Sequence, residues 1–358
     1  MAVSSFFEGL KVVELASVLA GPAVGMFFAE LGAEVVKVEN PRTGGDVTRC
    51  WKLPTEDMGS PISAYYCAAN YHKQVRLLDL STEEGRGEAY RLIGDADVLI
   101  SNYKLSSARH LGMDYETLRS INPRLVYGQL TAFGEAETLP AFDVVLQAEA
   151  GFLYMCGEAG REPSKMPVAL IDLLAAHQLK EGILLALLRR QQTGQGAYVT
   201  TSLLEAAIAS LANQATNWLM AGHIARRMGS LHPNIAPYGD IFYALDDKPL
   251  VVAAGSDQQF RCLCQCLEEN GLATDERFST NTRRVLHREA LQEALAPAFR
   301  RQTREEWLRR FAGAGVPVGS IRNMQEVFER PQAQAMVLEE EIAGVKTKRV
   351  RTVAFDIR

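Results

Sequence analysis

The sequence predicts an α/β protein whose larger domain is built on a doubly wound parallel sheet. Three observations support this fold class. Short apolar runs rich in valine alternate with segments of helical periodicity through the first 131 residues. Small or polar residues follow the expected strands, where such sheets bind ligands. The 358 residues exceed what one hydrophobic core usually organises, so we expect two domains.

The first unit reads as strand, turn, helix and strand. Residues 10–15 form a β-like apolar run, and residues 17–22 form a turn of small residues. A helix is expected over residues 23–31 and a second strand over residues 34–39. The turn lacks the GxGxxG pattern, so a nicotinamide-dependent dehydrogenase has little support.

Later segments repeat this order. Strands are expected over residues 75–80, 98–100 and 125–131, and helices over residues 82–93 and 111–121. Asn102, Tyr103 and Lys104 follow the strand that ends at residue 100. Their position at a strand end predicts ligand contacts, although a plain solvated loop is the alternative.

The second half of the chain changes character. A helix is expected over residues 198–221, and a connector punctuated by proline follows it. A hairpin within residues 241–254 and three later helices predict a smaller α+β domain. The expected boundaries are 1–200 for the large domain, completed by 315–358, then 201–228 for a linker helix and 229–314 for the small domain.

Composition excludes several classes of protein. With 47% hydrophobic and 23% charged residues, the chain resembles ordinary globular proteins. The formal net charge of -5 argues against nucleic acid as a partner. The six cysteines lack the spacing of a zinc site, and neither a signal peptide nor a membrane-spanning run is evident. We expect a cytoplasmic protein without a metal or a membrane partner.

Asp172 is the strongest candidate for a functional residue. An apolar run over residues 166–171 precedes it, and leucines recur at helical spacing after it. An acid at this position can cap the helix, which is a purely structural role. Alternatively, it is a carboxylate held among apolar side chains, able to attack an electrophile. The local pattern leaves both interpretations open.

An ordered set of short segments resembles a known family. The segments are Leu19–Pro22, Leu31–Glu39, Gly45–Asp46 with Arg49, Leu78–Leu80, Asn122–Val126, Thr193–Gly196, Pro237–Tyr238, Asp257 with Phe260, Arg277–Phe278 and Gly315–Pro317. Together they resemble the class III coenzyme A transferases, the formyl-CoA and carnitine CoA-transferase family. The resemblance implies a Rossmann-like large domain made from both chain ends, a smaller domain between them, and an interlocked homodimer.

The resemblance also implies an activity. Asp172 falls on the family's catalytic aspartate, which carries coenzyme A from an acyl-CoA thioester to a free carboxylic acid. The intermediates would be a mixed anhydride and an aspartyl-CoA thioester, with coenzyme A and acyl-CoA as substrates and no prosthetic group. Residues implied to contact coenzyme A are Val18, Leu19, Ala20, Asn40, Leu78, Asn102, Tyr103, Lys104 and His110, whereas Phe142 and Asp143 would lie near the acyl group.

Two alternatives stay open. An acyl-CoA racemase or epimerase of the same superfamily would need a base before the acid at position 143, where this chain has Phe142. A non-catalytic protein that binds coenzyme A would use Asp172 only as a helix cap. Leu19 and Phe142 predict an apolar or medium-sized acid as substrate rather than formate or oxalate.

Overall fold

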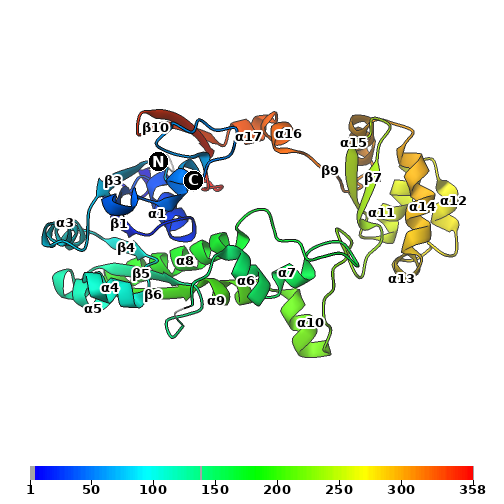
Figure 1. Ribbon diagram of the computed structural model, residues 1–358. Coiled ribbons are helices and arrows are strands. Elements are labelled where there is room, and N and C mark those ends of the chain that lie inside the picture. Colours follow the sequence, from blue (N-terminus) through cyan, green and yellow to red (C-terminus); the bar gives the residue numbers. More distant parts are fainter. Residues whose placement is uncertain (1–4, 138, 358) are drawn as a thin grey trace. The chain divides into compact units, whose positions relative to one another are not determined.

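The computed structural model describes residues 5–137 and 139–357, which divide into two units. A six-stranded sheet forms the centre of the larger unit (Figure 1). Across the sheet its strands are β3 (Lys73–Leu77), β2 (Glu34–Glu39), β1 (Lys11–Leu15), β4 (Val98–Ser101), β5 (Val126–Thr131) and β6 (Ala197–Ser202). Each neighbouring pair is parallel. This order creates a crevice where β1 and β4 end, and the α/β prediction is confirmed.

Strand side chains alternate between two apolar layers. Val12 and Val98, which are paired in register, pack with helices α1 (Ala20–Glu30) and α8 (Leu170–Thr193) on one face. Val13 and Leu99, the next pair, pack with helices α3 (Glu83–Gly94) and α5 (Tyr115–Ile121) on the other. Because both faces are covered, these strands read as continuous apolar runs.

Among the described residues up to 221 the chain forms ten α-helices, several of which flank the sheet or connect its strands. They are α1 (Ala20–Glu30), α2 (Ala64–Ala69), α3 (Glu83–Gly94), α4 (Leu105–Leu111), α5 (Tyr115–Ile121), α6 (Asp143–Glu149), α7 (Phe152–Met155), α8 (Leu170–Thr193), α9 (Leu203–Ala209) and α10 (Asn213–Ala221). Two short 3-10 helices, η2 (Pro41–Thr43) and η3 (Val47–Cys50), follow β2. In the part of the chain that the structure describes, no helix combines the length and apolar character needed to cross a membrane.

The single helix expected over residues 198–221 is wrong. Its first part is β6, which pairs with β5 from Val126↔Ala197 to Thr131↔Ser202. Aromatic and β-branched residues open this segment, and an available sheet edge beside β5 favours them as a strand. The stretch 201–228, expected as one linker helix, therefore holds the end of a strand and two helices, α9 and α10.

The smaller unit comprises Tyr154–Ser164 and Arg226–Gln334. Its antiparallel sheet contains β7 (Tyr238–Tyr243), β8 (Pro249–Ala253) and β9 (Val318–Ser320), and its helices are α11 (Asp257–Cys266), α12 (Asn270–Thr274), α13 (Asn281–Leu286), α14 (Arg288–Phe299), α15 (Arg304–Gly313), α16 (Met324–Phe328) and α17 (Pro331–Gln334). The return to the large domain expected at residue 315 is too early, because β9 pairs with β8.

The chain rejoins the larger unit at Ala335 and forms an antiparallel hairpin, β10 (Val337–Ile342) and β11 (Val345–Val350). The Glu30 carboxylate at the end of α1 pairs with Arg349 and accepts the N–H group of Val353 at 2.9 Å. The Glu340 carboxylate accepts the N–H group of His72. Early and late parts of the sequence thus build one unit.

Candidate active site

A cavity of about 540 Å³ lies at the carboxyl end of the sheet in the larger unit. Its walls come from the segments after β1, β4 and β5 and from the start of α8. Sequence-predicted residues that line it are Val18, Leu19, Ala20, Asn102, Tyr103, Lys104, Phe142 and Asp172. Parallel sheets bind ligands at this position, so this cavity, called the main cavity below, is the candidate active site.

Two further cavities extend the first one along the strand ends. A cavity of about 440 Å³ shares Asn102, Tyr103 and Lys104 with the first and is also lined by Asn40. A third, of about 240 Å³, shares Asn40 with the second and includes Leu78. Residues that the family resemblance implied for coenzyme A therefore line three neighbouring cavities, from the start of α8 to the segment after β3.

Asp143 caps the helix that carries Asp172. Helix α8 begins at Leu170, and the preceding residue, Ala169, offers it no side-chain cap. One carboxylate oxygen of Asp143 instead accepts the N–H groups of Ile171 at 2.7 Å and Asp172 at 3.2 Å. These are helix-terminal donors that otherwise lack partners. The capping role considered for Asp172 is thus filled by Asp143, which leaves the Asp172 side chain for another purpose.

Gln147 holds Asp143 in place. It lies one helical turn after Asp143 in α6 and donates a hydrogen bond from its side-chain amide to the second carboxylate oxygen. Its amide oxygen accepts the N–H group of Met166 at 2.9 Å. Together with the two N–H groups that Asp143 accepts, these contacts make four hydrogen bonds, which join α6, the segment before α8, and the start of α8 into one structure.

The Asp172 carboxylate lies in an environment that disfavours its charge. Its residue is 9% exposed, and no residue within the described ranges donates a hydrogen bond to its side chain. Burial, and secondarily the charge of Asp143, raise the pKa of Asp172 from 3.8 to about 7. The site therefore contains a basic, poorly solvated carboxylate, which can act as a nucleophile or as a proton acceptor.

Two residues that were predicted to contact the ligand use their side chains for hydrogen bonds to the protein backbone instead. The Asn102 amide donates to the carbonyl oxygen of Ser17 at 2.9 Å and accepts the Ser17 N–H group at 3.2 Å. The Asn40 side chain accepts the N–H group of Arg42 at 2.9 Å and so caps η2. Both residues line the cavities, and their hydrogen bonds determine the shape of the walls.

His110 lies apart from the other predicted residues. It occupies the last turn of α4, is exposed, and lines none of the three cavities. Arg42, which the sequence reasoning did not select, lines the third cavity. Its guanidinium lies 3.6 Å from the carboxylate of Asp79 and is 70% exposed. Its signal in the sequence was only its position two residues after Asn40.

Trp51 and Tyr65, two aromatic residues that cluster with Phe142, also escaped the sequence reasoning. The rings of Trp51 and Tyr65 lie 5.2 Å apart, and those of Trp51 and Phe142 lie 6.4 Å apart. Burial and the charges of Asp172 and Asp143 raise the pKa of Tyr65, which places its hydroxyl within their electrostatic reach. Nothing in the sequence linked residues 51 and 65 to a helix that begins a hundred residues later.

The chemistry of the site rests on carboxylates and apolar walls. Across the described residues, no group of three or more His, Cys, Asp or Glu side chains is arranged to hold a metal ion. The lining of the main cavity includes Leu19, Leu130, Ala141 and Leu203, which favour substrates with apolar atoms beside the reacting group.

Comparisons with known proteins show the family to which the chain is related. Residues 7–358 match CoA-transferase family III. The chain is 38% identical to the succinate–glutarate CoA-transferase of Agrobacterium fabrum, over 92% of this chain and 83% of that protein. It is 35% identical to the acetyl-CoA:oxalate CoA-transferase of Acetobacter aceti, over 92% and 84%. A CAIB/BAIF family protein from Brucella suis has a similar structure, with a TM-score of 0.86, 40% identity, and coverage of 98% and 92%.

The buried charge of Asp172 should cost stability. Its folded-state pKa of about 7 lies above the ordinary 3.8, so the folded protein binds more protons than the unfolded chain between these values. Stability from this group therefore falls as pH rises from 3.8 to 7. At pH 8, Asp172→Asn should be more stable than the wild type by roughly 2–4 kcal/mol. Urea denaturation across this pH range measures the difference, and a gain independent of pH contradicts the assignment.

Proposed function

The chain belongs to CoA-transferase family III, and from this premise we propose that it transfers coenzyme A through a covalent intermediate on Asp172. Coenzyme A transfer between an acyl-CoA and a free carboxylic acid is the activity of the family. The observation that carries the assignment of Asp172 is its buried carboxylate, which receives no hydrogen bond from the described residues and has a pKa of about 7. Such a carboxylate is a better nucleophile than a hydrated one.

The first half of the proposed cycle loads the enzyme. A carboxylate oxygen of Asp172 attacks the thioester carbonyl carbon, and the C–S bond breaks with release of coenzyme A as a thiolate. The product is a mixed anhydride between Asp172 and the acyl group. The thiolate then attacks the side-chain carbonyl carbon of Asp172 and expels the donor acid as a carboxylate. Asp172 is left as a thioester of coenzyme A.

The second half runs these steps in reverse with another acid. The acceptor carboxylate attacks the aspartyl thioester, the thiolate leaves, and a new mixed anhydride forms. Attack of the thiolate on the acceptor acyl carbon gives the new acyl-CoA and regenerates the Asp172 carboxylate. No proton or electron is gained or lost overall. Water must be kept from the anhydride, because water would hydrolyse it. The apolar lining of the main cavity favours this exclusion of water.

We propose that coenzyme A extends along the three cavities. Val18, Leu19 and Ala20 line the cavity that contains Asp172, where they would flank the pantetheine arm. Lys104 lines the first and second cavities, and its ammonium suits the diphosphate.

Asn40 and Leu78 line the third cavity, where the nucleotide would lie. Arg42, a cation in the same lining, suits a phosphate group better than the predicted His110, which lies outside the cavities. Coenzyme A is a substrate in this proposal, and no prosthetic group takes part. A cytoplasmic location stays a prediction from the sequence.

A covalent adduct on Asp172 is the central prediction. Incubation with an acyl-CoA followed by hydroxylamine should convert Asp172 into a hydroxamate, because both proposed intermediates are activated acyl groups. Mass spectrometry of the proteolysed protein identifies the modified residue. Labelling should become faster as pH rises to about 7, since the carboxylate form is the nucleophile.

Two variants test the specificity of this adduct. Asp172→Ala should bind acyl-CoA without forming a hydroxamate or transferring coenzyme A. Asp114→Ala is a matched control, because Asp114 is an acid at the start of another helix, α5, where it accepts the N–H group of Thr117. The control should label like the wild type. If the wild type forms no hydroxamate but exchanges the α-proton of its acyl-CoA, the protein is a racemase and the proposal is wrong. If Asp172→Ala still transfers coenzyme A, Asp172 is not the nucleophile.

We propose a medium-sized carboxylic acid as acceptor. The apolar lining of the main cavity supports an acid with methylene groups, and the names of two relatives contain glutarate. Each buried methylene contributes about 0.8 kcal/mol, so glutarate should exceed oxalate in kcat/KM by at least about tenfold. Chromatography of the acyl-CoA products, with oxalate, succinate, glutarate and hexanoate as acceptors, makes the comparison. Oxalate as the preferred acceptor contradicts the proposal.

A homodimer is proposed because the larger unit exposes an apolar surface. Large apolar side chains on and after α8, α9 and α10 are exposed, with Leu185 at 68%, Leu219 at 78% and Met220 at 82%. Side chains of this kind are available to an interface if they adjoin one another. A second copy of the chain is the occupant that the family resemblance implies.

Subunit exchange distinguishes an interlocked dimer from an ordinary one. Sedimentation should give twice the mass of the chain. Two tagged forms mixed in the folded state should form no heterodimer, because threaded chains separate only by unfolding. Heterodimers should appear after joint unfolding and refolding. A monomeric mass, or rapid exchange between folded proteins, contradicts the interlocked dimer.

A further inference from the structure

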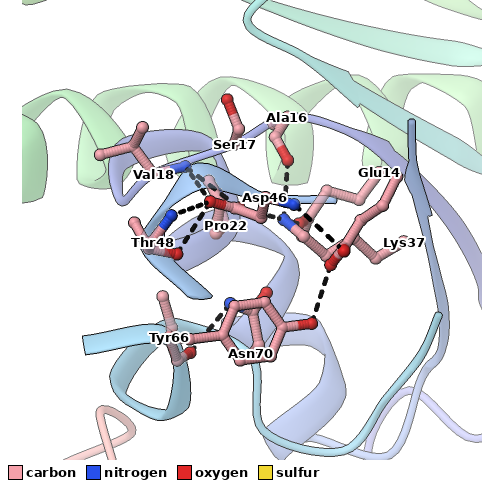
Figure 2. Close-up of polar contacts among 12 residues, drawn as sticks. Glu14, Ala16, Ser17, Val18, Pro22, Lys37, Asp46, Thr48, Tyr66 and Asn70 are labelled. Carbon is pink, nitrogen blue, oxygen red and sulfur yellow. Dashed lines mark hydrogen bonds and ion pairs between the residues drawn. The ribbon is translucent and has the colours of Figure 1, made fainter. Parts of the chain in front are cut away.

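Val18 has a strained backbone in the wall of the main cavity. Its φ angle of 73° lies in the left-handed region, which β-branched residues rarely occupy. The Asp46 carboxylate accepts the Val18 N–H group, with oxygens at 3.2 and 3.4 Å. The same carboxylate accepts two hydrogen bonds from Thr48 at 2.8 and 3.0 Å (Figure 2). Asp46 therefore connects η3 to a strained residue of the site.

Lys37 links Asp46 to the core of the sheet. Its ammonium lies 3.0 Å from the Asp46 carboxylate and 2.9 Å from that of Glu14, with all three side chains buried (Figure 2). It also donates to the carbonyl oxygen of Ala16 at 2.7 Å. Lys73 provides a second buried cation, 2.7 Å from Glu14.

The turn 16–18 is thus held at each of its residues. Lys37 donates to the Ala16 carbonyl group, and Asp46 accepts the Val18 N–H group. Asn102 bonds to both the backbone N–H and the backbone carbonyl group of Ser17. The three side chains come from β2, from the end of β4 and from the start of η3. Each contact comes from a different segment of the chain, so the conformation of the turn is strongly determined.

Stability alone does not account for this cluster of buried charges, because removing them from water costs free energy. Two carboxylates and two ammonium groups are removed from water, and buried ion pairs often stabilise no more than apolar side chains would. A Cβ atom at position 25 would lie 2.0 Å from a carboxylate oxygen of Glu14. Gly25 thus leaves the space that the Glu14 side chain occupies. Strained backbone held by surrounding structure is typical of functional sites.

We propose that Asp46 and Lys37 are positioning residues, which hold the turn 16–18 in the conformation that the transfer reaction requires. They act through the Val18 N–H group and the Ala16 carbonyl group, and neither needs to touch the reacting atoms. The turn leads into Leu19 and Ala20, which line the same cavity as Asp172. The proposal rests on the proposed function and extends it to residues behind the cavity wall.

A double-mutant cycle between Asp46 and Val18 tests this proposal. Asp46→Asn keeps the shape of the side chain but removes its charge, and should lower kcat roughly 10- to 100-fold through misplacement of the turn. The KM for acyl-CoA should change little, because most of the ligand would bind elsewhere. Glycine adopts a positive φ without steric cost, so Val18→Gly in the Asp46→Asn background should restore kcat to within a few fold of Val18→Gly alone.

Glu30→Gln is the matched control. Glu30 is also a buried carboxylate paired with a cation and with backbone N–H groups, those of Thr352 and Val353, but it lies away from the cavities. This variant should lose thermal stability and keep kcat. If Asp46→Asn unfolds, Val18→Gly and Val18→Ala decide instead, because alanine keeps the strain whereas glycine removes it. The glycine variant should have the higher unfolding temperature and the higher kcat.

The outcomes separate this proposal from the function on which it rests. If the wild type forms the adduct on Asp172 but Asp46→Asn has an unchanged kcat, the positioning role is wrong and the proposed function stands. Failure of Val18→Gly to restore kcat, or equal behaviour of the glycine and alanine variants, also overturns it. Absence of the adduct in the wild type refutes the proposed function and the positioning role with it.

Discussion

The distribution of hydrogen bonds at the start of α8 is the constraint on which the site depends. Two carboxylates lie near the same helix terminus, and Asp143 accepts the N–H groups of Ile171 and Asp172. The Asp172 side chain accepts no such hydrogen bond from the described residues, and burial raises its pKa. Because Asp143 caps the helix, Asp172 lies in the first turn without serving as the cap.

The remainder of the larger unit holds this helix terminus against the sheet. A Cβ at Gly128 in β5 would lie 2.8 Å from the side chain of Ile183, and one at Gly182 in α8 would lie 2.6 Å from Val199. The two glycines allow α8 to approach β5 and β6 closely. Close packing of a long helix on rigid strands limits movement of its first turn, and reactive groups benefit from such fixed supports.

The sequence was informative where neighbours along the chain determine structure. Alternation of apolar runs and helices predicted the α/β sheet, and the apolar run before Asp172 made this residue a candidate, although only the family resemblance favoured catalysis over capping. Prediction failed where distant partners decide. Residues 197–202 form a strand because β5 offers an edge. The pairing of Lys37 with Glu14 arises from the register of β1 and β2, and Asp46 reaches the same ammonium from the start of η3; local patterns reveal neither contact.

The hairpin of β10 and β11 has a consequence for synthesis. Its Arg349 and the following residues complete the surroundings of Glu30, and Glu340 reaches back to His72. A ribosome makes these contacts available only in the last stretch of translation, after the whole of the smaller unit has emerged. The unit that begins first is therefore finished last, and a chain that stopped at Gln334 would contain every residue of the smaller unit but lack the hairpin of the larger one.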